Sequence, residues 1–396
     1  MRILIHDYAG HPFQAQLSRE LARRGSEVFH IYAGYNTTPR GNLGIEDKDP
    51  QGLRIDGVYS KDPLNKYSFY TRWRQEVEYG RLISDRIRSI RPHTVISANT
   101  PLDSQREMLK TCKKQNVKFV YWLQDVLGIA AYRLLQDRYS YFGSLVGKHH
   151  IRMERNMLRD SDHVVVIAED FQPIIEGWGV SQDKITVIPN WAALDEMPVR
   201  TKINHWSVES KLDNKFCFLY TGSMGLKHNP ALLLQLAKHY EENEAICIVV
   251  ISEGLGAQWL LEQKESLSLN NLILMDYQEY EVMPDVLGSA DVLVAMLTPA
   301  ASEFSVPSKV LSYMCANRPL LVSIPNDNLM AKIIMDYRMG YAVPPMDISG
   351  FVKAADDLVE HPEYCGTFGN NARAYAEKHF NIEKIGDSFE RILCPQ

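Results

Sequence analysis

Two lysines follow predicted strands and stand beside small residues that would let the backbone come close to a ligand. Lys227 lies in the segment TGSMGLK after the apolar run 215–220, and Lys309 ends the segment SVPSK after the apolar run 291–297. Amides at a helix N-terminus together with an ammonium group favour a phosphate. A cation in the first turn of a helix is otherwise disfavoured by about 0.3–1 kcal/mol. We therefore hypothesise that a diphosphate is held between these two loops.

Both loops also have a purely structural interpretation. The GxxG spacing of Gly222 and Gly225 matches neither the dinucleotide motif nor the P-loop. A glycine turn with a solvated Lys227 is the alternative for the first loop. A surface lysine whose stem covers apolar side chains is the alternative for Lys309. The candidates for phosphate contact are Gly222, Ser223, Gly225, Lys227, Ser305, Val306, Pro307, Ser308 and Lys309.

Carboxylates near the ends of other predicted strands suit hydroxyl groups better than phosphate. Glu303 is excluded as a phosphate ligand by its charge, but it can accept hydrogen bonds from sugar hydroxyls. Glu253 follows the predicted strand AICIVVIS and precedes two glycines, and Asn190 ends the run VIPN. A solvated loop acid is the alternative for Glu303.

The first half of the chain has a second set of candidates at strand ends. Gly10 and His11 follow the apolar run RILIH, and a glycine there allows a substrate to come close. Gln124 and Asp125 directly follow the apolar run KFVYWL, and this position puts a carboxylate where a ligand would bind. A tight turn at Gly10 and a capping role for Asp125 are the alternatives.

Strands that alternate with helices must position all of these residues. The pattern of an apolar run, a glycine turn and an amphipathic segment begins at residue 2 and starts again near residue 215. This repetition predicts an α/β fold with two parallel sheets in tandem, separated in the polar stretch 195–215. In such open sheets, ligands bind beyond the carboxyl ends of the strands. The candidate residues above all follow strands.

Composition limits the class of protein. The chain has 396 residues, 45% hydrophobic and 23% charged, as in ordinary globular proteins of two or three domains. No apolar stretch approaches the roughly 20 residues of a membrane span, and no signal peptide is evident, so we expect a cytoplasmic protein. The six cysteines are far apart, and they suggest neither disulfides nor a zinc site.

The charge is divided unevenly along the chain. Residues 1–195 carry a net charge of +4 and the remainder carries −10. The segment 64–92 interleaves arginines with aromatic residues, so an anionic membrane surface, at the inner face of the plasma membrane, is a candidate partner. An amphipathic helix with ordinary salt bridges is the alternative, because the segment also holds Glu76, Glu78 and Asp85. Nucleic acid is not expected, because the chain is acidic overall and no basic stripe appears in the second half.

Four segments together resemble the GT-B glycosyltransferases of family GT4, in particular bacterial enzymes of exopolysaccharide, capsule and O-antigen assembly of the colanic-acid type. HDYAGHPFQAQLSRELARRGSEV is similar to the family's first strand, glycine loop and helix, and AEDFQPIIEGWGVSQDKITVIPNW to its interdomain region. YTGSMGLKHNP resembles the donor-phosphate loop, and VPSKVLSYMCANRPLL the helix that binds the donor nucleotide. The resemblance covers nearly the whole chain.

The resemblance implies an activity and a domain plan. The activity is transfer of a sugar from a nucleotide-diphosphate sugar to an acceptor hydroxyl, with retention at the anomeric carbon and with neither a cofactor nor a metal. The acceptor would be a saccharide or a lipid-linked saccharide. Residues 1–200 would form an acceptor-side Rossmann-like domain, and residues 210–377 would form the nucleotide-sugar domain across a cleft. The helix in 378–396 would pack back on the first domain.

The resemblance also implies roles for single residues. Lys227 and the loop amides would neutralise the leaving diphosphate, Glu303 would contact the donor sugar, Gly10 would leave room at the reaction centre, and Asp125 would lie near the acceptor hydroxyl. Ser312 stands where many members carry a second glutamate, and Ser223 stands where many carry an arginine. We hypothesise that Lys309 supplies the missing positive charge.

Two other functions compete with sugar transfer. A GT-B sugar-nucleotide epimerase would need acid and base groups beside the sugar ring. A non-catalytic nucleotide-sugar-binding subunit is compatible with the absence of the second glutamate. Interconversion of free sugar nucleotides would reveal the former, and donor binding without transfer or hydrolysis would reveal the latter.

Overall fold

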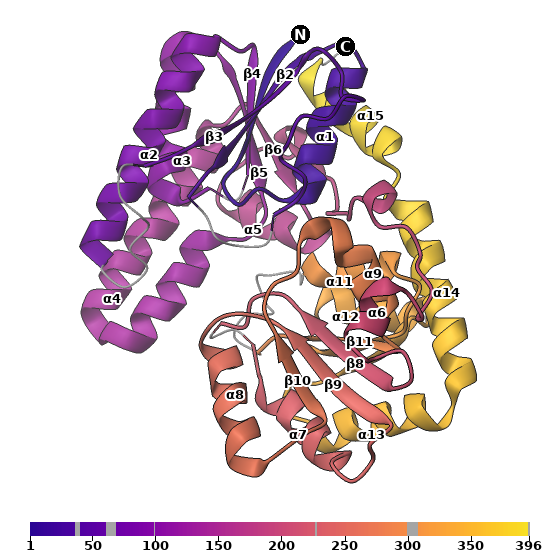
Figure 1. The fold of residues 1–396 in the computed structure, drawn as a ribbon. Coiled ribbons are helices and arrows are strands. Elements are labelled where there is room, and N and C mark those ends of the chain that lie inside the picture. Colours follow the sequence, from indigo (N-terminus) through magenta and orange to yellow (C-terminus); the bar gives the residue numbers. More distant parts are fainter. Residues whose placement is uncertain (36–39, 61–68, 99, 226–227, 299–307, 395–396) are drawn as a thin grey trace. The chain divides into compact units, whose positions relative to one another are not determined.

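A computed structural model of the chain describes residues 1–35, 40–60, 69–98, 100–225, 228–298 and 308–394 (Figure 1). The chain forms two compact units, one made of Met1–Asn190 with Ile382–Gln396 and the other of Trp191–Asn381. Each unit contains a parallel sheet with helices packed along it (Figure 1). The last helix therefore belongs to the unit in which the chain begins.

The first unit is built on a parallel sheet with the strand order β3-β2-β1-β4-β5-β6-β7. Its strands are β1 Arg2–Asp7, β2 Glu27–Ala33, β3 Leu53–Val58, β4 Thr94–Ala98, β5 Lys118–Leu123, β6 His163–Val166 and β7 Ile185–Val187. Its helices are α1 Pro12–Arg23, α2 Phe69–Ile90, α3 Leu102–Gln115, α4 Leu127–Asp160, α5 Gln172–Gly177 and α15 Ile382–Leu393. All of β4 is buried, as expected for a parallel strand covered on both faces.

Helices cover both faces of this first sheet. The step from β1 to β2 and the step from β4 to β5 run in opposite directions across the sheet, so right-handed crossovers put α1 and α3 on opposite faces. The returning helix α15 lies beside α1 (Figure 1). Arg24 at the end of α1 donates to the carboxylates of Asp387 and Glu390, each at 2.7 Å. The buried ring of Phe389 meets the Trp122 ring on β5 with 4.9 Å between centroids.

Contacts within α4 show that this helix folds back on itself. A straight α-helix would separate Gly128 from Ile151 by about 35 Å, at 1.5 Å per residue. A Cβ built at Gly128 would instead lie 2.9 Å from the Ile151 Cα, and one built at Gly147 would lie 2.5 Å from the Tyr132 Cα. The two arms pack closely because these positions have no side chain. The second arm thus carries Glu154 to the start of the first, where its carboxylate accepts from the Gly128 amide at 2.7 Å.

The second unit is built on a parallel sheet with the strand order β10-β9-β8-β11-β12-β13. Its strands are β8 Phe216–Thr221, β9 Ile246–Ile251, β10 Leu272–Met275, β11 Val292–Met296, β12 Leu320–Ser323 and β13 Gly340–Val343. Its helices are α6 His205–Glu209, α7 Ala231–His239, α8 Leu255–Leu267, α9 Met283–Gly288, α11 Ser308–Cys315, α12 Leu329–Asp336, α13 Ile348–Glu360 and α14 Pro362–His379. Its core packs apolar residues of β8, β9 and β11 against α7 and α13.

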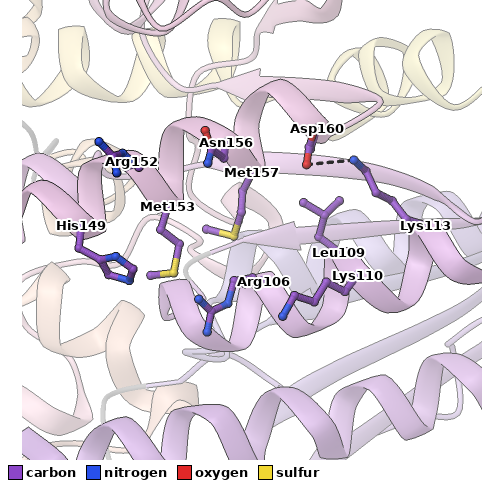
Figure 2. A pocket seen from close by; sticks show the side chains of 10 residues that line it. All are labelled: Arg106, Leu109, Lys110, Lys113, His149, Arg152, Met153, Asn156, Met157 and Asp160. Carbon is purple, nitrogen blue, oxygen red and sulfur yellow. Dashed lines mark ion pairs between the residues drawn. The ribbon is translucent and has the colours of Figure 1, made fainter.

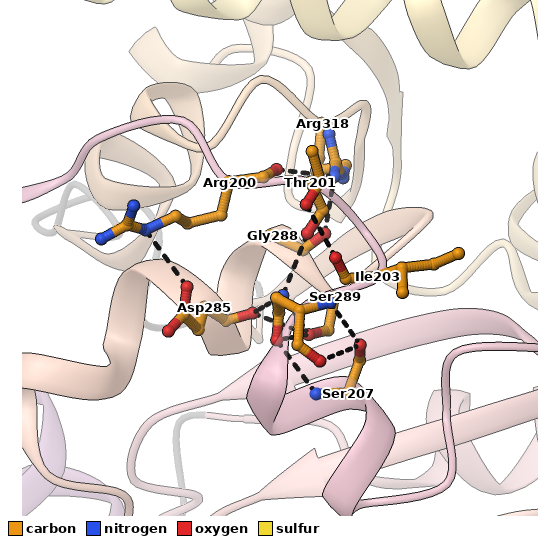
Figure 3. A network of polar contacts seen from close by, with 9 residues as sticks. Arg200, Thr201, Ile203, Ser207, Asp285, Gly288, Ser289 and Arg318 are labelled. Carbon is orange, nitrogen blue, oxygen red and sulfur yellow. Dashed lines mark hydrogen bonds and ion pairs between the residues drawn. The ribbon is translucent and has the colours of Figure 1, made fainter.

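A polar network ties the start of the second unit to α9 (Figure 3). The Arg318 guanidinium donates to the carbonyls of Arg200 and Gly288 at 3.1 and 2.6 Å. The Asn204 side chain caps α6 and donates to the Ser289 hydroxyl at 3.0 Å. Part of the polar stretch that lacks sequence periodicity is therefore packed against the second sheet's helices.

The predicted α/β fold with two Rossmann-like domains is confirmed by the two parallel sheets. Two edge strands, β3 and β13, were missing from the prediction. Burial along β3 is interrupted by exposed residues, so this strand has no continuous apolar run, and β13 has only four residues. Both signals are too weak to identify a strand by pattern.

Candidate functional site

The carboxyl edge of the second sheet brings predicted donor-side residues together. Strand β8 lies between β9 and β11, so the segments that follow these three strands leave the sheet side by side. Gly222, Ser223 and Gly225 follow β8, and Glu253 follows β9 with its side chain exposed. Five predicted positions lie outside the described residues: Lys227, Glu303, Ser305, Val306 and Pro307.

Lys309 lies beside the glycine loop, although 87 positions separate it from Gly222 in the sequence. It is the second residue of α11, and its ammonium donates to the Tyr220 hydroxyl at 2.5 Å. Gly222 has a φ of +117°, and a Cβ at this position would lie 3.3 Å from the Lys309 Nζ. The glycine is thus required by its backbone conformation, and it leaves space beside the ammonium group.

The amides of this loop are largely used within the protein. Gly222 N donates to the Ile251 carbonyl at 3.0 Å, and Gly225 N donates to the His228 ring at 3.1 Å. No described residue accepts a hydrogen bond from the Ser223 N–H. The sequence suggested a row of free amides, whereas among residues 222–225 only the Ser223 amide has no acceptor among the described residues.

Two buried tyrosines fix the loop and the helix in this arrangement. Tyr220 accepts from Lys309 and donates to the Ser223 carbonyl at 3.0 Å. The Tyr313 hydroxyl on α11 accepts from the Thr221 amide at 3.0 Å. Burial raises the pKa of both phenols above the usual value, so both hydroxyls keep their protons. The loop therefore has a defined conformation next to Lys309.

The remaining described donor-side candidates lie on α11 and at the end of β9. Ser308 is exposed as the first residue of α11, and Ser312 is half-buried one turn after Lys309. The Glu253 carbonyl accepts from the Met224 amide at 3.0 Å. The backbone of Glu253 and the hydroxyl of Ser223 both contact the Tyr277 phenol, which links the loops after β8 and β9.

In the first unit, Gly10 has two structural requirements of its own. Its φ is +80°, and a Cβ at this position would lie 2.9 Å from the Leu43 Cδ1. The carboxylate of Asp7, fully buried at the end of β1, accepts from the amides of Ala9 and His11. A side chain at this position would therefore meet Leu43, and the expected approach of a substrate to Gly10 stays a prediction.

A cavity of about 250 Å³ lies at the carboxyl ends of β1 and β5 and brings three predicted acceptor-side residues together. These residues are His11, Gln124 and Asp125. The complete lining is Ala9, His11, Thr100, Tyr121, Trp122, Leu123, Gln124, Asp125 and Leu127. Gly10 is not among the lining residues. The cavity is thus formed by the end of β5 and by residues that follow β1, β4 and β5.

Glu154 was not predicted from the sequence, and it supports the loop after β5. Its carboxylate accepts from the amides of Leu127 and Gly128 at 3.1 and 2.7 Å. Burial raises the pKa of Glu154 to about 8, and the nearby charge of Asp125 adds to this increase. No pattern in the sequence reveals this contact, because it depends on the fold-back of α4.

A second groove, of about 280 Å³, lies between α3 and the second arm of α4 (Figure 2). Its floor contains Leu109, Met153 and Met157, and basic side chains extend along its rim. The lining basic residues are Arg106, Lys110, Lys113, His149 and Arg152. The Lys113 ammonium also forms an ion pair with Asp160 at 3.0 Å. The sequence had directed attention to 64–92, not to this pair of helices.

Comparison with solved structures shows where the fold recurs. Sucrose-phosphate synthase from Thermosynechococcus elongatus superposes with a TM-score of 0.75 at 15% identity over 99% of this chain and 98% of the other. WaaG, a glycosyltransferase involved in lipopolysaccharide biosynthesis, gives 0.71 at 13% over all of both chains. HepE from Anabaena, solved with UDP and with UDP-glucose, gives 0.70 at 13% over 99% of both. A sequence search of curated proteins returns no match.

Sequence profiles of two families match successive parts of the chain. The family described as Glycosyltransferase Family 4 matches residues 14–196, and that described as Glycosyl transferases group 1 matches residues 202–375. The chain belongs to the GT4 family of GT-B glycosyltransferases. The resemblance of the four sequence segments to GT4-family GT-B glycosyltransferases is therefore confirmed. No helix among the described residues of this glycosyltransferase is both long and apolar enough to cross a membrane.

Several residues around the two sites of this glycosyltransferase were missed at the sequence level. Tyr220, Tyr277 and Tyr313 hold the donor-side loops, and Asp7 and Glu154 hold the loops beside the cavity. Tyr220 and Asp7 lie at the ends of predicted strands, and this position could have identified them from the sequence. The other three are on segments whose approach to the site depends on tertiary packing.

Proposed function

We propose that this glycosyltransferase moves a hexose from a nucleotide-diphosphate sugar to an acceptor hydroxyl, with retention at the anomeric carbon and without a metal. Its role would be in bacterial surface polysaccharide assembly. The observation that carries the proposal is the position of Lys309, whose ammonium lies beside Gly222 and donates to the Tyr220 hydroxyl. Such a group suits the negative charge of a diphosphate.

The proposed chemistry requires charge stabilisation at the leaving group. A bond would form between the acceptor oxygen and the anomeric carbon on the face from which the diphosphate departs, while the bond from that carbon to the diphosphate breaks and the hydroxyl proton passes to an oxygen of the departing phosphate. Negative charge then develops on the leaving phosphate, where a fixed ammonium and an amide lower the barrier. Lys309 and Ser223 would provide this stabilisation, with Lys227 as a second cation. Glu303 would contact the donor sugar.

A uridine nucleotide is a reasonable first donor to test. HepE, which has the same fold, has been solved with UDP and with UDP-glucose. At 13% identity this likeness concerns the fold, so the base of the donor is an open choice for experiment. We propose that Ser312 lies on the donor side near the ribose, and that Ser308 and Glu253 border the same loops.

The acceptor would bind at the cavity of the first unit. Asp125 and Gln124 at the end of β5 face this cavity together with His11. We propose that Asp125 orients the attacking hydroxyl, which is a saccharide hydroxyl or part of a lipid-linked saccharide. The groove between α3 and α4 offers cations to an anionic membrane surface that would present such an acceptor (Figure 2). Binding to anionic vesicles that disappears in high salt would support this contact.

A thermal-shift panel with UDP, GDP, dTDP and ADP, each in the presence of EDTA, tests the donor proposal. A nucleotide at 100 times its dissociation constant should stabilise the protein by about 2.7 kcal/mol. Hydrolysis and transfer are then measured with the matching sugar nucleotide, and the anomeric configuration of the product is read by NMR.

Each part of the proposal can fail separately in this experiment. Stabilisation by none of the nucleotides would contradict donor binding, and turnover that requires an added divalent ion would contradict the metal-free mechanism. An inverted product would contradict retention. Interconversion of free sugar nucleotides would favour an epimerase, and binding without hydrolysis or transfer would favour a binding subunit.

A further inference from the structure

Two side-chain amides meet at the end of β5 in the first unit. Asn190 Nδ2 donates to Gln124 Oε1 at 2.5 Å. Gln124 lines the 250 Å³ cavity with only 6% of its surface exposed. The other two polar atoms of the pair, Gln124 Nε2 and Asn190 Oδ1, are buried and have no partner among the described residues. A buried donor and a buried acceptor are therefore left over in one pair.

Such an arrangement is costly unless a ligand satisfies it. A buried polar group without a hydrogen bond loses the solvation it had in the unfolded chain, so native proteins rarely keep two together. Exchanging the nitrogen and oxygen positions in both amides leaves the same inventory of one donor and one acceptor. The pair thus offers complementary hydrogen-bonding groups regardless of this assignment.

The chemistry of the cavity selects among ligand classes. A hydroxyl group both donates and accepts, so it can satisfy the unpartnered atom of Gln124, which lines the cavity, whichever way the amide is placed. A phosphate has only acceptors at its charged oxygens, and it would meet the Asp125 carboxylate in the same lining. An alkyl chain would leave both amides unpaired. Aromatic side chains of Tyr121 and Trp122 in the lining suit the apolar face of a sugar ring.

We propose that this cavity binds a neutral sugar unit of the acceptor, and that Gln124, held in place by Asn190, reads a hydroxyl of its ring. The proposal rests on the proposed function, because it names the acceptor of that transfer. It adds Gln124 as a specificity-determining residue and Asn190 as the residue that positions it, and it makes the group bound here a saccharide whether or not a lipid is attached farther along the acceptor.

The test uses the full chain and methyl glycosides of glucose, galactose, mannose and fucose as probes. Binding is measured by saturation-transfer NMR, and UDP stabilisation is recorded on the same protein samples. At least one glycoside should bind to the wild type. Among its deoxy analogues, the one that lacks the hydroxyl read by Gln124 should bind at least 10-fold more weakly.

Variants connect this binding to the amide pair. The double variant Gln124→Met with Asn190→Leu removes both partners, so it should stay folded while glycoside binding falls at least 10-fold. UDP stabilisation should persist, because Lys309 and Gly222 are in the other unit. The matched control Gln115→Met, at an exposed position of α3, should bind the glycoside like the wild type.

The outcomes separate this inference from the proposed function. If UDP stabilises the protein but none of the four glycosides binds, the sugar site is wrong and the donor proposal stands. If a glycoside binds equally well to the double variant, the amide pair does not read it and the inference is overturned. If neither UDP nor any glycoside binds, both proposals fail.

Discussion

The neutral hydroxyl of Tyr220 holds the charged ammonium of Lys309 in place through a hydrogen bond. The phenol accepts from the ammonium and donates to the Ser223 carbonyl, so a single rotamer of the lysine is favoured beside Gly222. Burial keeps the Tyr220 proton in place by raising its pKa. A lysine held in this way loses little further freedom when an anion binds.

Replacing Lys309 by methionine removes the ammonium and keeps most of the stem. We expect kcat for sugar transfer or donor hydrolysis to fall by about 10²–10³-fold, as for the loss of one charge-stabilising donor. The control is Lys332→Met at an exposed position of α12, where turnover should not change. Unchanged turnover and unchanged UDP stabilisation in the Lys309 variant would contradict its assigned role.

The two glycines of the loop after β8 give a matched pair of substitutions. Gly222→Ala forces a side chain into a φ of +117° and should cost about 1–3 kcal/mol in the free energy of unfolding. Gly225→Ala should change it by less than about 0.5 kcal/mol, because a Cβ there meets nothing within 4 Å. Urea unfolding measures both. Equal effects would show that this loop is not held as described.

At the scale of elements, helix α4 brings the buried acid Glu154 close to the end of β5. Close packing of the two arms of α4 at Gly128 and Gly147 lets Glu154 accept from the Leu127 and Gly128 amides at the start of the helix, shortly after Asp125. The raised pKa of Glu154, about 8, means that this acid prefers its neutral form when folded. The titrating group Glu154 therefore lies on the second arm of α4 and contacts the start of the helix beside the cavity lining.

The Glu154→Gln variant should show a flatter dependence of stability on pH. Between the unfolded pKa of about 4.3 and the folded value of about 8, the folded state binds more protons, so wild-type stability decreases as pH rises through this window. The free energy of unfolding of the wild type should thus fall relative to that of the variant between pH 5 and pH 8. Urea unfolding at several pH values measures it. A difference in the free energy of unfolding between wild type and variant that does not change with pH would contradict the raised pKa of Glu154. Glu169→Gln, at an exposed position, is the control substitution.

At the scale of the whole molecule, the chain returns to the unit in which it began. Helix α15 buries Phe389 against Trp122, and Arg24 anchors the same helix through Asp387 and Glu390. Trp122 also lines the candidate acceptor cavity. The end of the chain thus supports the packing behind that cavity.

Truncation of Phe389 to alanine should destabilise the protein by about 3–5 kcal/mol, because the ring is fully buried. Ser388→Ala in the same helix is the control, and its effect should stay below about 0.5 kcal/mol. Chemical unfolding followed by circular dichroism measures both. A small effect at Phe389 would show that α15 is not packed on the first unit.

Particular residues show how far the sequence could lead. Continuous apolar runs such as 118–123 and 246–251 identified buried parallel strands, and polar residues directly after them, such as Gln124 and Asp125, line a cavity at the carboxyl edge of the sheet. The hypothesis of one anion between the loops of Gly222 and Lys309 also came from the residues that follow each strand. These features are local, because strand pattern and chain punctuation depend on neighbouring residues.

The tertiary structure alone decided which polar groups find partners. Asn190 and Gln124 are 66 positions apart, and Glu154 reaches the start of its own helix only because α4 folds back. The same holds for the Gly222 amide, which is used by Ile251 and not left for a ligand. A hydrogen bond needs its two atoms within about 3 Å, and that separation is set by packing between segments that the sequence does not place relative to each other.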